Sequence, residues 1–232
     1  MNHPFQSLSK KERAIWIVSL FAVTVSNLVS GDFDPLTLLS ALIGVTSLIF
    51  AAKGNVWAQI LMIVFSILYG IISFRFRYWG EMIISLGLTL PMSIWSTMTW
   101  LRNPSEKNGN EVAIRKLNRH HVAALAVSSL AVTAGAYFLL RALRTPNIVF
   151  STFSITTSFF SASLAMLRSS YFALGYSAND IVLIVLWILA SLEDPVYIPV
   201  VVNYSIFLFN DLYGFVSWKK REARQNGTSP SR

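Results

Sequence analysis

The sequence contains no cysteine and few charged residues for its length. Asp, Glu, Lys and Arg make up 13% of the 232 residues, about half the share of an ordinary soluble domain. The missing cysteines exclude a disulfide-stapled secreted module and a thiolate metal site, and they leave the redox compartment open. Hydrophobic residues account for 54% of the chain, which excludes a soluble enzyme and indicates a polytopic membrane protein.

Long stretches without Asp, Glu, Lys or Arg recur from Ala14 onward. A helix needs about 20 apolar residues to cross the hydrocarbon core of a bilayer. Strand-like alternation is absent, and a backbone that faces lipid must satisfy its own hydrogen bonds, so helices are predicted. The fold class is therefore an all-α polytopic membrane protein with eight transmembrane helices. The predicted spans are 14–30, 36–52, 56–74, 82–101, 122–140, 148–167, 171–192 and 196–218, with a polar loop around 102–121.

The first span follows Lys10, Lys11 and Arg13, as a signal peptide does, but it is long for one and lacks an A-x-A cleavage pattern, so we predict a retained helix. Lys and Arg are distributed unequally between successive connectors. With the N-terminus inside the cell, fifteen of them lie on the cytoplasmic side and four outside. Positive charge favours the cytoplasm, so both termini are predicted to be cytoplasmic. The basic tail with Lys219, Lys220, Arg221 and Arg224 is then expected to be a solvated flank that touches anionic lipid.

The spans repeat with an offset of roughly 115 residues, the signature of a duplicated unit. Spans two to four and six to eight form two three-helix units in one orientation, as some transporters have. Aromatic residues 118 positions apart support the repeat: Trp95 with Tyr213, Trp100 with Trp218, and Tyr69 with Trp187. The predicted organisation is an extra N-terminal helix (1–35), a first repeat (36–101), a loop and linker helix (102–147), a second repeat (148–218) and a basic tail (219–232).

Two aspartates fall within predicted spans, where a charge costs about 2.5–3.5 kcal/mol at the helix centre. Asp180 is near the middle of the bilayer, and Asp211 is in the inner third of the last span. Neither can face lipid cheaply, and Lys and Arg are absent from the span interiors. One interpretation is that Asp180 lies at or beside a ligand and Asp211 pins helices together. The alternative is that both only join helices by hydrogen bonds to neighbouring hydroxyls and amides.

Amide and aromatic side chains share helix faces with these aspartates, at spacings of three or four residues. Such side chains from several helices suit a mid-membrane site for a ring-bearing, hydroxylated solute. The candidate substrate-binding residues are Gln59, Tyr69, Asn179, Asp180, Trp187, Asn203, Tyr204 and Asn210. The candidate structural or gating residues are Pro91, Trp95, Trp100, Asp211 and Tyr213.

The sequence lacks the residue patterns needed for metal binding, ATP binding or hydrolysis. His120 and His121 are adjacent and diverge by about 100° on a helix, with no Cys, Asp or Glu cluster nearby, so no metal site is predicted. The sequence has no P-loop for ATP, and no Ser, His and Asp share a depth in the membrane. We predict no enzyme activity, no cofactor and no nucleic-acid partner.

Two motifs resemble the PnuC-type vitamin transporters, bacterial relatives of the SWEET sugar carriers. The first motif is Tyr-x-Gly-Glu-Met at 78–82 with Leu90, Pro91, Met92, Ser93 and Trp100 after it. The second is Asn-Asp-x-Tyr-Gly at 210–214, preceded by Asn179, Asp180, Leu186 and Trp187 and followed by Trp218 and a basic tail. The resemblance covers about residues 36–224. The first span matches an extra N-terminal helix that some members carry.

This resemblance implies a 3+1+3 arrangement of helices, a homotrimer in the cytoplasmic (inner) membrane, and facilitated diffusion of nicotinamide riboside with trapping by cytosolic phosphorylation. Many members line the vitamin site with W-x-x-W in the seventh span, and this chain has only Trp187 there. Thiamine, riboflavin or a nucleoside therefore stay open as substrates. A proton-coupled carrier that uses Asp180 and a membrane scaffold without transport also stay open.

Overall fold

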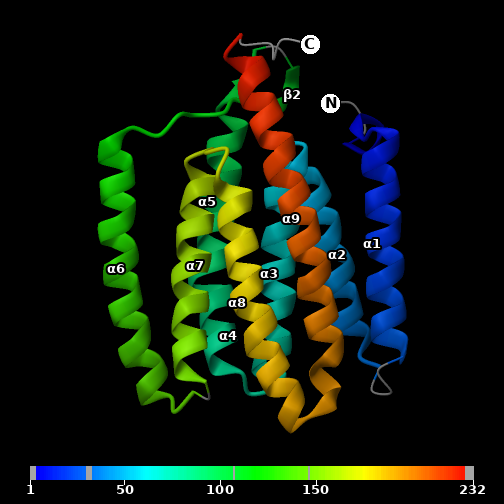
Figure 1. The fold of residues 1–232 in the computed structure, drawn as a ribbon, viewed down its shortest axis with the longest axis vertical. Helices are drawn as coiled ribbons and strands as arrows, with labels where there is room; N and C mark the ends of the chain where they lie inside the picture. The colour runs from blue at the N-terminus through cyan, green and yellow to red at the C-terminus, as the bar shows by residue number, and fades with distance from the viewer. Residues whose placement is uncertain (1–3, 30–32, 107, 146, 228–232) are drawn as a thin grey trace.

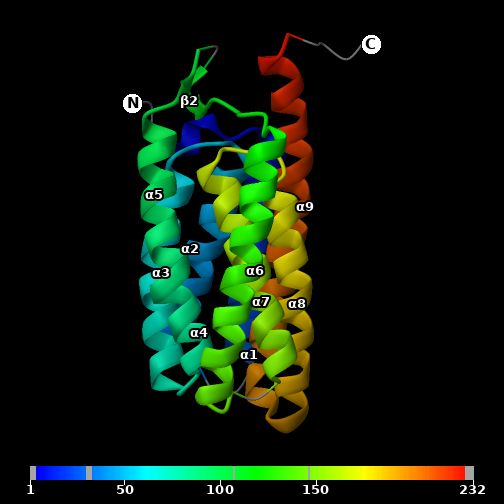
Figure 2. The same ribbon diagram turned by 90° about the vertical axis from the view of Figure 1, so that its left-hand side faces the viewer.

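The computed structural model describes residues 4–29, 33–106, 108–145 and 147–227. Eight helical segments in these ranges are long and apolar enough to cross a membrane, which confirms the predicted number. They are α1 (Lys10–Val29), α2 (Pro35–Ala52), α3 (Trp57–Arg75), a composite segment from Trp79 to Leu101, α6 (Arg119–Ala142), α7 (Ile148–Met166), α8 (Phe172–Glu193) and α9 (Ile198–Gln225). They run side by side along the long axis of the molecule (Figures 1 and 2). The chain is a multi-pass membrane protein.

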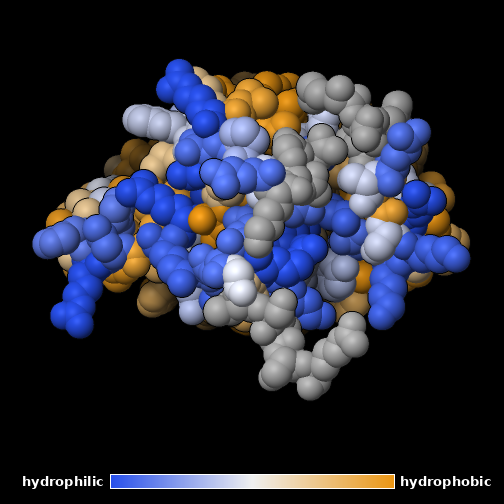
Figure 3. All heavy atoms as spheres, turned by 90° about the horizontal axis from the view of Figure 1, so that it is seen from above, coloured by the Kyte–Doolittle hydropathy of each residue, from blue (hydrophilic) through white to orange (hydrophobic). Residues whose placement is uncertain are grey.

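Helix α1 begins and α9 ends at the same end of the bundle, which we call the terminal end, and the opposite end is the distal end (Figure 1). Hydrophilic residues cover much of the terminal end, with hydrophobic side chains showing around its rim (Figure 3). This distribution fits an end that meets water and sides that meet lipid.

Two helices reach further at the terminal end than the sequence predicts. Helix α1 begins at Lys10, so the basic residues before the first predicted span belong to the helix. Helix α9 has 28 residues and continues to Gln225, about 42 Å at 1.5 Å per residue. The prediction that Arg221 is solvated is wrong, because its side chain is only 3% exposed and binds groups of α2 and of the hairpin that follows α5.

The fourth span is not one regular helix. It consists of α4 (Trp79–Ile83), a π-helical turn η2 (Ile84–Thr89) and α5 (Leu90–Leu101). In the turn the N–H of Leu90 reaches back five residues to the carbonyl of Ser85. Pro91 follows directly and has no N–H to donate, so the wider turn places the local irregularity where the regular hydrogen-bond ladder would fail anyway.

The predicted polar loop around 102–121 contains a small antiparallel hairpin of β1 (Pro104–Ser105) and β2 (Asn108–Val112). Val112 donates its N–H to the carbonyl of Gly54 in the turn after α2. Gly54 has a positive φ of 65°, and a Cβ there would come within 2.7 Å of Arg221. Glycine therefore suits this position for both its conformation and its size.

Each end of the bundle has its own hydrophobic core. At the terminal end Trp100, Phe172 and Trp218 pack with Phe50 and their neighbours. Towards the distal end a second cluster joins α1, α2, α8 and α9 around Leu183, Trp187, Tyr204 and Phe207. Helices α2 and α9 pack together, as do α5 and α7, and α6 packs mainly against α7. Two of the cavities between the described helices contain most of the predicted binding residues.

Candidate functional site

The first cavity opens near the distal end and is lined by α1, α2, α3, α8 and α9. Including the part open to solvent, it occupies about 900 Å³. Three aromatic rings meet beside its mouth: Tyr78 lies 5.2 Å from Trp187 and 5.5 Å from Tyr197, measured between ring centroids. Trp187 and Tyr197 are also 5.5 Å apart. These rings give the distal cavity an aromatic wall on which a flat ring can stack.

A negative charge lies at the mouth of the distal cavity. Asp34 caps α2: its Oδ2 accepts hydrogen bonds from the backbone N–H and the hydroxyl of Thr37, at 3.2 and 2.7 Å. Partial burial alone would raise the pKa of Asp34, but the bonds from Thr37 and the charge of Arg75, 3.4 Å away, outweigh it and lower the pKa. Asp34 therefore stays ionised at neutral pH and forms an ion pair with Arg75 at the mouth of the cavity.

Four aromatic side chains separate the distal cavity from a second, central one and line both. Phe65 stacks on Tyr69 with ring centroids 5.6 Å apart, and Phe207 meets both Phe65 and Tyr204 edge to face. The hydroxyl of Tyr69 lies beside that of Tyr204. We call Phe65, Tyr69, Tyr204 and Phe207 the aromatic layer. A solute that passes between the cavities has to cross it.

The central cavity contains three carboxyl groups from three helices. Asp180 of α8 and Asp211 of α9 are neighbours, and Glu81 of α4 lies on the same cavity. All three are at most 8% exposed. Within the described ranges, no three His, Asp or Glu side chains are placed to hold a metal ion. The carboxyl groups are instead suited to hydrogen-bonding or attracting an organic solute with donor groups or a positive charge.

Three buried polar atoms on the walls of the two cavities have no hydrogen-bond partner among the described residues: Tyr69 Oη, Asp180 Oδ2 and Trp187 Nε1. Such atoms are rare in native interiors because each costs about 1–3 kcal/mol. The carbonyl oxygen of Asn179, by contrast, accepts bonds from Thr157 at 2.7 Å and Ser158 at 3.0 Å. These bonds leave the NH₂ group of Asn179 as its donor towards the central cavity.

Most of the predicted binding residues line these cavities. Tyr69 and Tyr204 line both, Trp187 and Asn203 line the distal one, and Asn179 and Asp180 line the central one. The side chains of Asp180 and Asp211 lie next to each other, although the sequence predicts separate ligand and helix-pinning roles for them. Those two roles stay predictions.

Two predicted binding residues lie away from the cavities. Gln59 is in the first turn of α3, close to the terminal end. Asn210 turns towards α1 and donates to Ser19 Oγ at 3.0 Å and to the Ile206 carbonyl at 2.8 Å. The structure therefore places Asn210 as a link between α9 and α1, and Asn210 lines neither of the two cavities.

The predicted structural or gating residues have different surroundings. Trp95 is 60% exposed on the outside of the bundle, away from both cavities. Trp100 is buried and donates from Nε1 to the Ala165 carbonyl at 2.9 Å. Tyr213 lies beside Glu12 of α1. Pro91 follows the π-helical turn that contributes Ser85 and Thr89 to the central cavity.

Sequence reasoning missed several residues of the site, among them Glu81 and Asn27. Glu81 was placed before the fourth span, but α4 begins at Trp79, so this carboxyl group lies inside the bundle. The available signal was its place in the Tyr-x-Gly-Glu-Met motif. Asn27 of α1 lines the distal cavity and lies 3.4 Å from Asn203, measured from Nδ2 to Oδ1. The extra N-terminal helix therefore contributes to the site, and only its contact with α9 reveals this.

Aromatic rings close the central cavity towards the terminal end. Trp218 is fully buried seven residues beyond Asp211 on α9, about 10 Å along the helix. Its ring centroid is 4.6 Å from Phe172 and 5.5 Å from Trp100. Trp218 Nε1 donates to the Ala51 carbonyl at 2.7 Å, which fixes the ring against the end of α2. We call Trp100, Phe172 and Trp218 the terminal plug.

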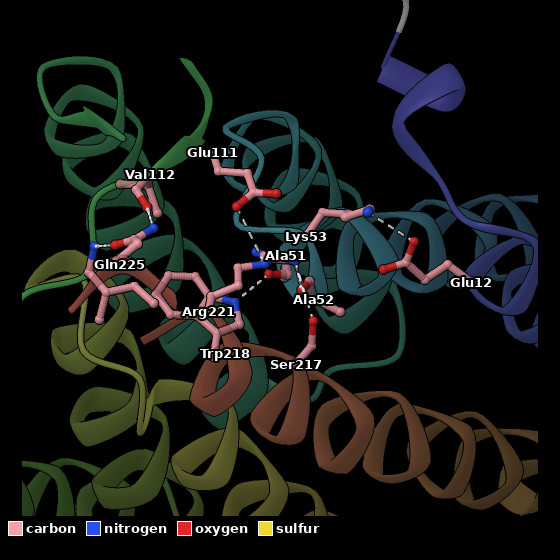
Figure 4. A network of polar contacts seen from close by, with 11 residues as sticks. Glu12, Ala51, Ala52, Lys53, Glu111, Val112, Ser217, Trp218, Arg221 and Gln225 are labelled. Carbon is pink, nitrogen blue, oxygen red and sulfur yellow. Dashed lines mark hydrogen bonds and ion pairs between the residues drawn. The ribbon is translucent and has the colours of Figure 1, made fainter. Parts of the chain in front are cut away.

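A polar network covers the terminal plug from outside (Figure 4). Arg221 binds the Ala52 carbonyl and the hydroxyl of Ser217, and its Nε is 3.6 Å from Glu111 of the hairpin. Gln225 binds both the N–H of Ile114 and the carbonyl of Val112. Lys53 pairs with Glu12 at 3.1 Å nearby. The end of α9 is thus joined to α2 and to the hairpin by groups that must separate if this end opens.

Comparison with known proteins gives consistent matches over most of the chain. A family model described as nicotinamide mononucleotide transporter matches residues 34–220. Two curated relatives are each called nicotinamide riboside transporter PnuC. The one from Neisseria mucosa is 24% identical and covers 92% of this chain and 83% of its own. The one from Haemophilus influenzae is 23% identical and covers 97% of each.

A solved structure described as the vitamin B3 transporter PnuC has the same fold. It superimposes with a TM-score of 0.82 at 20% identity and covers 94% of both chains. The predicted family is confirmed by the family model, which spans all but the first helix and the last few residues. The chain belongs to the nicotinamide mononucleotide transporter family, the PnuC-type vitamin transporters.

Proposed function

We propose that this protein carries nicotinamide riboside across the membrane by facilitated diffusion, through the distal and central cavities. The observation that carries this proposal is the set of unpartnered buried polar atoms on the cavity walls, Tyr69 Oη, Asp180 Oδ2 and Trp187 Nε1. Ligand groups would satisfy all three, whereas a scaffold would have no need to keep them unpaired. The names of the two relatives support this choice of solute.

The chemistry of the cavities matches the parts of nicotinamide riboside. Its pyridinium ring is flat and positively charged, so it can stack on the aromatic layer and be attracted by Asp180 and Asp211. Its ribose hydroxyls and carboxamide both donate and accept hydrogen bonds, as Asn179, Asn203 and the Tyr69 hydroxyl require. We assign Asp180 to the cationic ring. Many family members have a W-x-x-W pair in the seventh span, where this chain has only Trp187. Tyr78 and Tyr197 lie beside Trp187 and supply further aromatic rings.

The proposed orientation places the terminal end in the cytoplasm and the mouth of the distal cavity outside the cell. The Lys and Arg excess at the terminal end supports it. The two three-helix repeats stay part of the proposal, with boundaries at 36–101 and 148–218. The first helix of each repeat packs against the last helix of the other, α2 against α9 and α7 against α5, as expected of a parallel repeat. The homotrimer and the trapping by cytosolic phosphorylation rest on the family resemblance.

Uptake of labelled nicotinamide riboside into proteoliposomes tests the function. We expect flux that stops at equal concentrations inside and outside, because nothing in the proposal couples transport to energy. A second candidate is a proton-coupled carrier, which the neighbouring carboxyl groups of Asp180 and Asp211 favour. Accumulation beyond equilibrium under a pH gradient, lost in Asp180→Asn, would establish that candidate. A folded protein with neither binding nor flux would favour the scaffold.

A tryptophan substitution tests which residues form the site. We expect Trp187→Ala to weaken binding of nicotinamide riboside by about tenfold, since a stacked ring contributes roughly 0.5–1.5 kcal/mol beyond its area. Trp187→Phe keeps a ring but removes the unpartnered Nε1–H, so its loss should be smaller. Asn210→Ala is the matched control, because Asn210 binds Ser19 and lines neither cavity. Equal losses in Asn210→Ala and Trp187→Ala, measured by calorimetry, would contradict the proposed site.

A further inference from the structure

Helix α6 lies at the edge of the bundle, beside α7 (Figure 1). At the distal end Leu140 packs in a small cluster with Ile84 and Ile155. Nearer the terminal end Leu125 of α6 is buried in the terminal core, whereas Val127 is 67% exposed. Helix α6 therefore meets the bundle with one face only.

A groove occupies the space between α6, α7 and α8 in the terminal half of the bundle. Its walls are mainly apolar and include Val122, Leu125, Phe160, Leu164, Leu174 and Ala178. From Tyr171 to Ala178 the groove follows α8 for about 10 Å at 1.5 Å per residue. This is most of the depth of one hydrocarbon leaflet, about 15 Å. The groove therefore has the size and polarity of a seat for acyl chains.

Two basic residues stand at the terminal end of this groove. Arg115 and Lys116 lie on its lining and are exposed. Arg115 donates from Nη2 to His121 at 2.9 Å, which leaves other guanidinium donors for a phosphate. The acidic residue on the same lining, Glu222, is already paired with Lys219 at 2.7 Å. The net charge at this end of the groove is positive.

Hydrogen bonds hold the segment that carries these two charges in place. The N–H of Arg115 donates to the carbonyl of Arg168 at 3.0 Å. Arg168 in turn donates from Nη1 to the Ala113 carbonyl at 3.1 Å. The N–H of Ile114 binds Gln225 Oε1 at 2.8 Å. The backbone that carries the basic pair is thus held above the groove before any ligand arrives, which lowers the cost of binding.

We propose that this groove binds one anionic phospholipid from the leaflet at the terminal end. Its acyl chains lie between α6 and α8, and its phosphate is bound by Arg115 and Lys116. Arginine binds phosphate through several parallel hydrogen bonds, and lysine adds a second positive charge. Basic pockets between transmembrane helices at a membrane surface are a known way of selecting anionic head groups. If the groove were instead a contact with a second copy of this chain, a basic end next to an apolar groove would not be needed.

The test measures lipid binding by the delipidated full-length protein in detergent. Native mass spectrometry counts the bound molecules, and thermal unfolding reports stabilisation, with phosphatidylglycerol, phosphatidylcholine or inorganic phosphate added. We expect one phosphatidylglycerol to bind and to raise the Tm by a few degrees. Phosphatidylcholine should bind more weakly, and inorganic phosphate alone should give no stabilisation, because it lacks acyl chains. Equal effects of the two lipids, or of phosphate alone, would overturn the proposal.

Two substitution pairs separate the charge from the groove. Arg115→Gln with Lys116→Gln should weaken phosphatidylglycerol binding by roughly 25-fold, about fivefold for each charge removed. Lys11→Gln with Arg13→Gln removes the same charges from exposed positions of α1 at the same end and should leave binding unchanged. If both pairs weaken binding equally, net charge and not this site attracts the lipid, and the proposal fails.

A larger side chain tests the apolar part. Ala178→Trp should fill the groove and reduce the count of bound phosphatidylglycerol, whereas Ala126→Trp on the exposed side of α6 should not. The oligomer mass should stay constant in both variants. If Ala178→Trp changes the oligomer mass and leaves lipid binding intact, the groove is a contact between copies of this chain, and the lipid assignment is wrong.

Discussion

Replacing Asp180 by Asn is expected to weaken binding of nicotinamide riboside by about 10- to 100-fold, the effect of losing a charged hydrogen-bond partner in a buried site. Asp180 is 4% exposed in the central cavity, and its Oδ2 has no partner among the described residues. The side chain of Asn has the same shape but no charge, so it should fold normally. Isothermal calorimetry on the purified protein measures the change directly.

The control for the Asp180 prediction is a neutral analogue of the same shape. In dihydronicotinamide riboside the ring carries no positive charge, so Asp180→Asn should change its affinity by much less. Asp211→Asn tests whether the neighbouring carboxyl shares the role. Because Asp180 and Asp211 are neighbours, we now expect Asp211→Asn also to weaken binding, in addition to lowering the Tm. Equal losses for the charged and neutral ligands would contradict the assignment of Asp180 to the ring.

Replacing Arg221 by Met is expected to destabilise the protein by about 3–5 kcal/mol, the usual cost of breaking a buried ion pair. Its guanidinium is 3% exposed, binds the Ala52 carbonyl and pairs with Glu111. These contacts hold α9 against α2 and the hairpin, directly outside the terminal plug (Figure 4). Their loss should therefore also favour opening at this end. Thermal unfolding in detergent measures the loss of stability.

Opening can be measured because the chain has no cysteine. In a Gly214→Cys variant the single thiol lies between Asp211 and Trp218, where a Cβ would make ordinary contacts with Ala52 and Ala173. A water-soluble maleimide should label this thiol several-fold faster when Arg221→Met is also present. Lys220→Met is the matched control, since Lys220 is the exposed neighbour of Arg221 on α9. Unchanged labelling in Arg221→Met would show that the network stabilises the fold without controlling access.

Hydrophobic length alone was enough to predict the number of spans. Each stretch of about 20 apolar residues has to become a helix because its backbone cannot bond to lipid. The ends of the spans were less predictable. Helix α9 extends past the predicted end of the last span and includes Arg221. The charge of Arg221 is accommodated there because its guanidinium binds groups of α2 and the hairpin. Glu81 lies inside because α4 begins three residues before the predicted fourth span.

Helix faces predicted the site only in part. Trp187, Tyr204 and Asp180 lie where the spacing suggested, since residues three or four apart share a face. Asn210 has the same type of side chain and the same periodicity, yet it binds Ser19 of α1. The spacing of residues predicts which side chains share a face of α9. It does not predict which neighbouring helix that face will contact. Helix α1 could not be assigned to a neighbour from the repeat, because it has no counterpart there.

The sequence by itself determined the membrane setting, the eight helices, the family and the presence of carboxylates in the bilayer. These follow from local properties, because apolar length and the cost of a charge in lipid act on each segment separately. Only the tertiary structure decided that Asp180, Asp211 and Glu81 share one cavity, that four aromatic rings divide it from the distal one, and that Arg221 is buried where it joins α9 to α2. Those arrangements depend on contacts between helices far apart in the chain, which no single segment encodes.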